Sequence, residues 1–319
     1  MFLTQDHAAK PDAVDPYLRS PSAADPNFEN FVSNWKRLRS RLTIFLGAGA
    51  SVGAKNRDGQ YLPTAFDLRN DVWRQFMLDD ADKESFDPTA LKGMTLEHAA
   101  AIAESRTGRS AVIEQVVSTF DCARPLWQHA VTPFLRPKAV FTVNFDELVE
   151  KGWRLQSGSF GVEELNLRYN SKADTSAPHT PLFKPHGTLQ HANRSIGSGG
   201  LVISMFDYFE MIGDYRDMIE KFLLDFDQSC VLFIGYSFGD MDICSELFRL
   251  RRKRNVPWYA VFPRDDSDVR RMYQDKFGVL QINKRFLDFV VELDQQVGFI
   301  PDEWKFDRLA TIRASEKIQ

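Results

Sequence analysis

Four short clusters of glycine and polar residues each follow an apolar run directly, and their residue types could do chemistry. They are Gly47-Ala48-Gly49-Ala50-Ser51, Thr142-Val143-Asn144-Phe145-Asp146, Lys184-Pro185-His186-Gly187 and residues 235–242, which read GYSFGDMD. Glycines allow a backbone to approach a pyrophosphate closely. A histidine can accept a proton near neutral pH. The combination therefore indicates nucleotide binding together with acid–base chemistry.

Each cluster alone also has an ordinary structural interpretation. The glycine spacing of the first cluster differs by one residue from that of dehydrogenases. About 20 positions later, no acidic residue stands at the end of a strand, where a dehydrogenase binds the ribose of its cofactor, and this disfavours hydride transfer. Asn144 and Asp146 are both good helix caps. His186 fits a structural role as well as a catalytic one, and Asp240 or Asp242 could cap a helix through its carboxylate.

The elements that must position these residues alternate between apolar runs and helical segments. We expect strands at 42–46, 139–143, 182–184, 201–204, 230–234 and 258–262. This alternation predicts an α/β fold: a Rossmann-like parallel sheet with helices on both faces, plus a smaller helical subdomain. Ligands bind at the carboxyl ends of the strands in such sheets. The four clusters lie at those ends.

The chain divides into three predicted segments. Residues 1–28 carry prolines at positions 11, 16, 21 and 26, which predicts an extended or disordered arm. Residues 29–297 are expected to form the Rossmann-like domain, with the helical subdomain inserted at about 79–136. Residues 298–319 are expected to form a C-terminal helical cap.

Composition excludes several classes of protein. The 40 basic and 44 acidic residues give a net charge of −4, so nucleic acid is not indicated as a partner. No run of 18 apolar residues is present, so we expect no membrane span and a cytoplasmic protein. The three cysteines form no CxxC pair, which rules out a disulfide scaffold and a four-cysteine zinc site within one chain. We therefore expect no metal.

Taken together and in this order, the four motifs resemble the sirtuin superfamily over about residues 40–262. They are most similar to a bacterial sirtuin-like branch of NAD hydrolases used in antiphage defence. The first two sequences, GAGAS and TVNFD, resemble the GAGxS phosphate loop and the TxNxD motif. The last two, KPHG and GYSFGDMDI, resemble the KLHG and GYSxxDxDI motifs of that branch.

The resemblance implies a role for each matching residue. It implies that Asn144 orients the nicotinamide ribose or the attacking water, that Asp146 shapes the nicotinamide pocket, and that His186 is the general base. The residues implied to bind NAD are Gly47, Ala48, Gly49, Ser51, Thr142, Gly235, Ser237 and Asp242.

Two departures from classical sirtuin deacylases bear on the substrate. The chain cannot build their zinc module, and residues 59–66 (GQYLPTAF) stand where they carry GIPDFR. The resemblance thus implies an NAD glycohydrolase that takes NAD as substrate, yields nicotinamide and ADP-ribose, and is held inactive until triggered. An NAD-dependent protein deacylase or ADP-ribosyltransferase is one alternative. A non-enzymatic nucleotide-binding subunit of a defence complex is the other.

The same resemblance sets expectations about partners. We expect a homo-oligomer that works with a separate sensor or HerA-type ATPase subunit, because the length leaves no room for a sensor. The basic cluster at 249–254 fits a helix C-terminus, where cations are favoured, and the alternative is a surface that binds nucleic acid or a partner.

Overall fold

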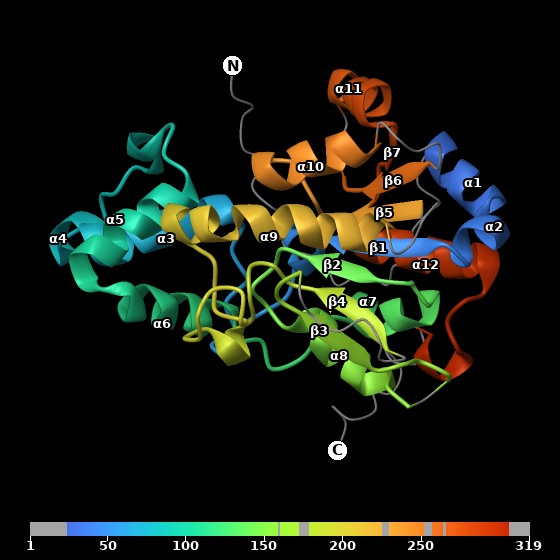
Figure 1. Ribbon diagram of the computed structural model, residues 1–319, viewed down its shortest axis with the longest axis horizontal. Helices are drawn as coiled ribbons and strands as arrows, with labels where there is room; N and C mark the ends of the chain where they lie inside the picture. Colours follow the sequence, from blue (N-terminus) through green and yellow to red (C-terminus); the bar gives the residue numbers. More distant parts are fainter. Residues whose placement is uncertain are drawn as a thin grey trace.

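A single parallel sheet organises the computed structural model, which describes residues 24–158, 160–171, 179–224, 230–251, 257–263 and 266–305. Within these residues the sheet has seven strands in the order β3-β4-β2-β1-β5-β6-β7 (Figure 1). Their bounds are β1 Leu42–Leu46, β2 Val140–Thr142, β3 Leu165–Arg168, β4 Thr180–Phe183, β5 Cys230–Ile234, β6 Trp258–Val261 and β7 Val279–Ile282. Every neighbouring pair is parallel. The predicted α/β class is confirmed.

The strand order places the centre of the sheet at β1. The chain builds β2, β3 and β4 on one side of β1, then crosses back to build β5, β6 and β7 on the other side. Leu46 pairs with Thr142 of β2 and with Ile234 of β5. The three central strands therefore end at the same level, and the loops that follow them start side by side at a topological switch point.

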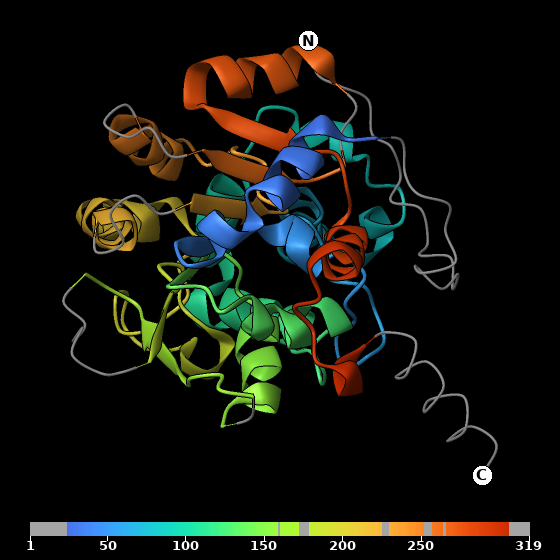
Figure 2. The same cartoon turned by 90° about the vertical axis from the view of Figure 1, so that its right-hand side faces the viewer.

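Helices cover both faces of the sheet (Figures 1 and 2). The helices that pack on the sheet are α1 Pro26–Ser33, α2 Trp35–Arg39, α7 Trp127–Val131, α8 Leu148–Gln156, α9 Met205–Leu224, α10 Met241–Arg251, α11 Ser267–Phe277 and α12 Phe286–Val297. Successive side chains of a strand point to opposite faces. Leu42, Ile44 and Leu46 accordingly pack in one core with α1, α2, α7, α8 and α12, whereas Phe45 packs in a second core with α9, α10 and α11.

A helical subdomain lies to one side of the sheet, at the left of Figure 1. Its helices are α3 Ala65–Met77, α4 Asp80–Lys83, α5 Leu96–Thr107 and α6 Arg109–Phe120. A capping box starts α3, because the Thr64 hydroxyl accepts from the amide of Asp67 and the Asp67 carboxylate accepts from the amide of Thr64. The apolar cluster of α3, α5 and α6 also takes in Leu189, Leu201 and Ile203, so the subdomain packs on the loop that follows β4.

Short 3₁₀ turns complete the description of the regular elements. They are η2 Ala48–Ser51, η3 Pro88–Leu91, η4 Thr132–Leu135, η5 Leu189–His191 and η6 Asp302–Trp304. Only η2 and η5 lie at the carboxyl ends of strands, after β1 and after β4 respectively. Both therefore belong to the loops that surround the predicted site.

Three expectations about elements need correction. The run 201–204 is not a strand: it is buried, but the amides of Leu201 and Val202 donate to Ala192 and His186 in neighbouring loops instead of a sheet ladder. Two strands were not expected, β3 and β7, which form the two edges of the sheet. The predicted arm includes the start of α1, where Phe28 is buried.

Other expectations fall partly outside the described residues. Residues 1–23 of the arm, 252–254 of the basic cluster and 306–319 of the predicted C-terminal cap lie there. The described part of that cap contains η6. Along the described part of the chain, no helix combines the length and apolarity needed to span a bilayer.

Candidate active site

The loops after β1, β2, β4 and β5 bring the four motifs to one end of the sheet. The first of these loops folds as η2 and packs directly on the fourth. The amide of Gly47 donates to Ile234 O at 3.0 Å, and the amide of Gly49 donates to Gly235 O at 2.9 Å. The first and fourth motifs thus form one unit of main-chain contacts.

Glycine is required at this junction by close approach. A Cβ on Gly49 would lie 2.8 Å from Gly235 O, and a Cβ on Gly235 would lie 2.1 Å from the amide nitrogen of Ala50. Gly235 also has a φ of +61°, which L side chains rarely adopt. The amides of Gly47 and Gly49 already donate hydrogen bonds within the protein. Ala48 and Gly49 are the residues of this loop that are exposed to solvent.

A hydrogen-bonded relay links the first motif to the second. Asn144 Nδ2 donates to Gly47 O at 3.0 Å and to Ser51 Oγ at 3.1 Å. Ser51 Oγ in turn donates to Asp146 Oδ2 at 2.7 Å. Since a carbonyl oxygen only accepts, the amide nitrogen of Asn144 must face Gly47, which leaves Asn144 Oδ1 on the other side. That buried oxygen has no hydrogen-bond partner among the described residues.

Two further contacts fix the loop that carries Asn144. The hydroxyl of Thr142, the last residue of β2, accepts from the amide of Asn144 at 3.2 Å. Asp146 Oδ1 accepts from the amide of Leu148 at 3.1 Å, where α8 begins. Thr142 and Asp146 are therefore structural partners of Asn144, and both are almost fully buried.

His186 follows β4 and is 4% exposed. Its Nδ1 lies 3.1 Å from Val143 O, and because that carbonyl only accepts, Nδ1 carries the proton. Nε2 is then a bare acceptor, buried and with no partner within the described part of the chain. Burial lowers the pKa of His186 to about 4, so the ring is neutral at pH 7. A buried, neutral nitrogen of this kind can accept a hydrogen bond from a substrate group or a water molecule.

Aromatic rings enclose the imidazole. Ring centroids lie 5.1 Å away for Tyr208, 5.6 Å for Tyr215 and 6.3 Å for Phe145. Burial raises the pKa of both tyrosines well above the usual value, so both keep their hydroxyl protons. The carboxylate of Glu97, in the first turn of α5, adds to the rise of both tyrosine pKa values. The helical subdomain thus contributes a negative charge to this wall.

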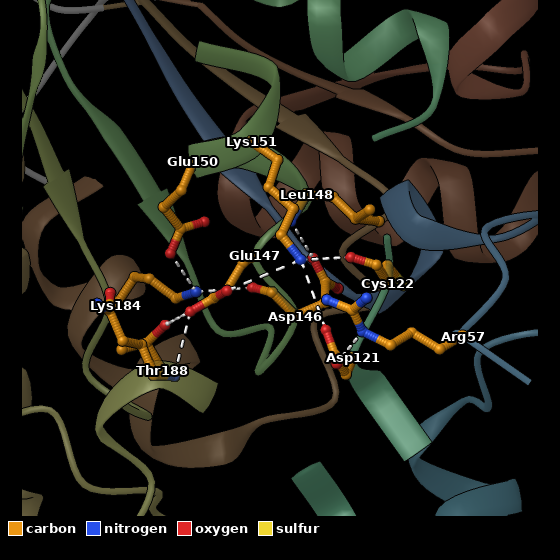
Figure 3. A network of polar contacts seen from close by, with 11 residues as sticks. Arg57, Asp121, Cys122, Asp146, Glu147, Leu148, Glu150, Lys151, Lys184 and Thr188 are labelled. Carbon is orange, nitrogen blue, oxygen red and sulfur yellow. Dashed lines mark hydrogen bonds and ion pairs between the residues drawn. The ribbon is translucent and has the colours of Figure 1, made fainter. Parts of the chain in front are cut away.

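Beneath the second and third motifs lies a polar network (Figure 3). Lys184 Nζ donates to Asp146 O and to Glu150 Oε1, both at 2.7 Å. Glu147 Oε1 accepts from the Thr188 hydroxyl at 3.0 Å. Lys151 lies 3.7 Å from the Asp121 carboxylate. The network joins the loop after β2 to the loop after β4.

The outer part of the fourth motif is arranged differently. Ser237 and Asp242 are exposed, and Tyr273 donates its hydroxyl proton to Ser237 O at 3.1 Å. Asp240 caps α10 by accepting from the amide of Ile243 at 3.2 Å. Burial raises the pKa of Asp240, and burial and the Asp240 charge raise that of Asp242. Gly235 therefore belongs to the packed centre, and Ser237 and Asp242 lie at its rim.

Cysteine chemistry does not fit this site. Burial raises the pKa of Cys122 and Cys244 to about 11 and that of Cys230 to about 12, so the three thiols stay protonated. Among the described residues, no group of three or more His, Cys, Asp or Glu side chains could hold a metal ion.

A separate apolar groove of about 420 Å³ lies between α5 and the start of α9. It is lined by residues such as Ile102 and Phe206 and contains none of the predicted site residues.

Five residues near the site were not predicted from their sequence positions: Lys184, Glu150, Glu97, Tyr208 and Tyr215. Lys184 stands inside the third motif, so its position was a usable signal. Tyr208 and Tyr215 are spaced seven residues apart on a long amphipathic helix, which resembles ordinary core packing. Nothing in the sequence pairs Glu97 with Tyr208 and Tyr215, or Glu150 with Lys184, which is 34 positions away.

Comparison with known proteins adds one match. A family model described as SIR2-like domain matches residues 138–282, and a search of curated proteins found no match to the chain. The matched range runs from β2 to β7 and contains the second, third and fourth motifs, whereas the glycine loop after β1 precedes it. SIR2-like domains use NAD and are generally enzymes, so the match points to an NAD-related function. Residues 138–282 thus match a SIR2-like domain, which supports the sirtuin-like superfamily for this chain.

Proposed function

We propose that this protein is an NAD glycohydrolase that cleaves NAD to nicotinamide and ADP-ribose. One observation carries the proposal: Asn144 Oδ1 and His186 Nε2 are buried hydrogen-bond acceptors without partners among the described residues, held on neighbouring loops next to the glycine loop. Buried polar atoms are nearly always paired. Two unpaired acceptors at a strand end are explained by donors that a substrate or water brings.

Each residue has a role that its contacts support. Asn144 Oδ1 accepts a hydrogen bond from the attacking water or a ribose hydroxyl and orients it. The bond between the anomeric carbon and nicotinamide breaks, its electron pair leaves with nicotinamide, and the water oxygen bonds to that carbon. The proton of the water passes to His186 Nε2, which is neutral at pH 7. We propose that Gly47, Ala48, Gly49 and Ser51 border the pyrophosphate, with Thr142 beneath Asn144 and with Gly235, Ser237 and Asp242 on the adenosine side.

The carboxylates near the site support the choice of an oxidised, cationic substrate. Departure of nicotinamide places positive charge on the ribose, and the carboxylates of Glu97 and Asp240 act electrostatically on Tyr208 and Tyr215, which lie beside His186. Negative charge near a developing cation stabilises the transition state. NADH lacks the cationic ring and is expected to be a poor substrate.

The test is nicotinamide release by the full chain, alone and with the products of adjacent genes. Asn144→Ala and His186→Ala should each lower turnover about 10²- to 10⁴-fold with the circular dichroism spectrum unchanged. His98→Ala, which alters an exposed histidine on α5, is the matched control and should keep full activity. Full turnover in His186→Ala would overturn the assignment. Turnover that requires an acylated peptide would favour a deacylase or ADP-ribosyltransferase, and NAD binding without turnover under every condition would favour a non-enzymatic subunit.

We further propose that the enzyme depletes NAD in the cytoplasm in antiphage defence and is held inactive until triggered by a separate sensor or HerA-type ATPase. This proposal rests on the resemblance of the four motifs. Cells that carry the intact system should lose NAD after phage infection, and cells that carry His186→Ala should not. Unchanged NAD levels during a defended infection would contradict the proposal.

The surface of α9 supports the expected homo-oligomer. Phe206, Phe209 and Ile212 are 61%, 60% and 54% exposed on one side of the helix. An isologous contact centred on Phe209 would place Phe206 against the partner's Ile212, and apolar patches of this kind often mark interfaces. Phe209→Lys should reduce the mass measured by light scattering, whereas Met272→Lys, at another exposed position, should not. An unchanged mass would contradict this surface.

A further inference from the structure

We propose that Lys184, with Glu150 as its counter-ion, is a positioning residue that sets the orientation of Asn144 for catalysis. The inference rests on the proposed function and deepens it. Lys184 is fully buried, and its ammonium group donates to two acceptors, Asp146 O and Glu150 Oε1, each 2.7 Å away (Figure 3). A buried ammonium group is tolerated only when its hydrogen bonds and its charge are satisfied.

The loop that carries Asn144 is held at both ends by the loop after β4. His186 Nδ1 donates to Val143 O, on one side of Asn144, and Lys184 Nζ donates to Asp146 O, on the other. Lys184 and His186 are two residues apart directly after β4. The two donors therefore fix the main chain of the residues between Val143 and Asp146 relative to the base itself.

The Asp146 residue transmits this restraint to the Asn144 side chain. Its carbonyl is held by Lys184, and its carboxylate accepts from Ser51 Oγ at 2.7 Å. Ser51 Oγ accepts from Asn144 Nδ2 at 3.1 Å. A shift of the Asp146 main chain would thus move Ser51 and rotate the Asn144 amide, and with it the unpaired Oδ1.

Glu150 balances the charge rather than contacting the loop. It is nearly buried, and burial raises its pKa while the Lys184 charge opposes that rise. Removing Lys184 alone would leave an uncompensated buried carboxylate, so a loss of folding in Lys184→Met would not by itself distinguish positioning from stability. The informative comparison is between two variants that both lack the Glu150 carboxylate, one of which keeps the Lys184 ammonium group with only neutral acceptors, Asp146 O and the glutamine side-chain oxygen.

Those variants are Glu150→Gln and the double variant Lys184→Met with Glu150→Gln. The first keeps the donor to Asp146 O, and the second removes it together with both charges. We expect kcat for NAD in Glu150→Gln to stay within about threefold of wild type, whereas kcat in the double variant falls about 100-fold, the size of effect that a displacement of about 1 Å can produce. KM should change little in both, because the contact acts on orientation.

A readout independent of turnover separates this inference from the proposed function. In protein labelled with ¹⁵N-asparagine, the side-chain amide of Asn144, assigned by its absence in Asn144→Ala, should keep its chemical shift in Glu150→Gln and move or broaden in the double variant. A folded double variant with wild-type kcat and an unchanged Asn144 signal would overturn the inference. If wild-type protein does not consume NAD even with the products of adjacent genes present, but the amide signal responds as stated, the positioning holds and the proposed function fails.

Discussion

The two sides of the switch point are built by different means. On the β2 and β4 side, buried side chains lock together: Asn144 contacts Ser51, Ser51 contacts Asp146, and His186 and Lys184 hold the main chain between them. On the β5 side, main chain packs on main chain through Gly49 and Gly235, and the polar side chains of the motif are exposed. The first arrangement fixes the direction of Asn144 Oδ1 and His186 Nε2. The second fixes the shape of the surface where we propose that the nucleotide binds.

Gly235→Ala should have the largest effect on stability, because it adds a methyl group where the main chains of Gly235 and Gly49 are in closest contact. The new Cβ would lie 2.1 Å from the amide nitrogen of Ala50, at a φ of +61°. We expect a loss of about 3 kcal/mol in the free energy of unfolding, measured with urea, from overpacking and backbone strain together.

Gly53→Ala separates the two causes of that loss. Gly53 also has a positive φ, +91°, but a Cβ there would meet nothing within 4 Å. This control should lose only about 1 kcal/mol. Equal losses in the two variants would show that backbone strain alone is at work and that the close packing of the β5 side is unimportant.

Acid should destabilise the protein through two buried histidines, His186 in the site and His129 on α7. Burial lowers the pKa of His186 and of His129 to about 4, well below the value near 6.5 of an unfolded chain. The unfolded state therefore binds more protons between pH 6.5 and pH 4, and stability present above pH 6.5 is lost as the pH falls through that range. At pH 5 each histidine should account for about 2 kcal/mol.

The measurement is the slope of unfolding free energy against pH. His129→Gln should flatten the slope between pH 6.5 and pH 4, since glutamine does not titrate, while His98→Gln at an exposed position should leave it unchanged. A slope that His129→Gln leaves intact would contradict the role given to burial.

Ser51→Ala should have a smaller effect on stability and kcat. Ser51 lies on the glycine loop and contacts Asn144 and Asp146 on the loop after β2. The substitution removes the group that accepts from Asn144 and donates to Asp146, so a buried carboxylate loses one hydrogen bond. We expect about 1.5 kcal/mol of lost stability and a roughly tenfold lower kcat. Ser118→Ala, at an exposed position of α6, should change neither quantity. Wild-type kcat in Ser51→Ala would show that the relay does not orient Asn144.

Ser237→Ala and Asp242→Asn should have the smallest effects. Both side chains are exposed at the rim, so stability should change by less than about 0.5 kcal/mol. If they contact the adenosine half of NAD, KM should rise a few-fold at unchanged kcat. A large fall in kcat would place them with the catalytic groups and remove the distinction between the two sides.

How far the fold could be predicted depended on the kind of strand. The fully buried β1 and β5 are continuous runs of large apolar residues, and their predicted bounds are confirmed. The edge strands β3 and β7 pair on one side only, and the sequence of β3, LNLR, mixes polar and apolar residues. The run 201–204 is equally apolar, but its burial comes from loops and the helical subdomain, which local sequence does not reveal.

The site divides in a similar way. The sequence predicted that the four motifs meet at one end of the sheet, because parallel strands bring their carboxyl ends together, and the chemical roles of Asn144 and His186 stay predictions. It did not reveal that Gly47 and Gly49 are needed for contact with Gly235 and Tyr236, since that contact joins residues nearly 190 positions apart. The Lys184–Glu150 pair was likewise hidden, because its partners are 34 positions apart on different elements.

The most direct test of the account follows the products of NAD by proton NMR, with the triggered full chain and no peptide present. The account predicts that nicotinamide and ADP-ribose appear together in equal amounts and that both disappear in His186→Ala. Nicotinamide release only after an acylated peptide is added, or equal release by His186→Ala, would contradict it.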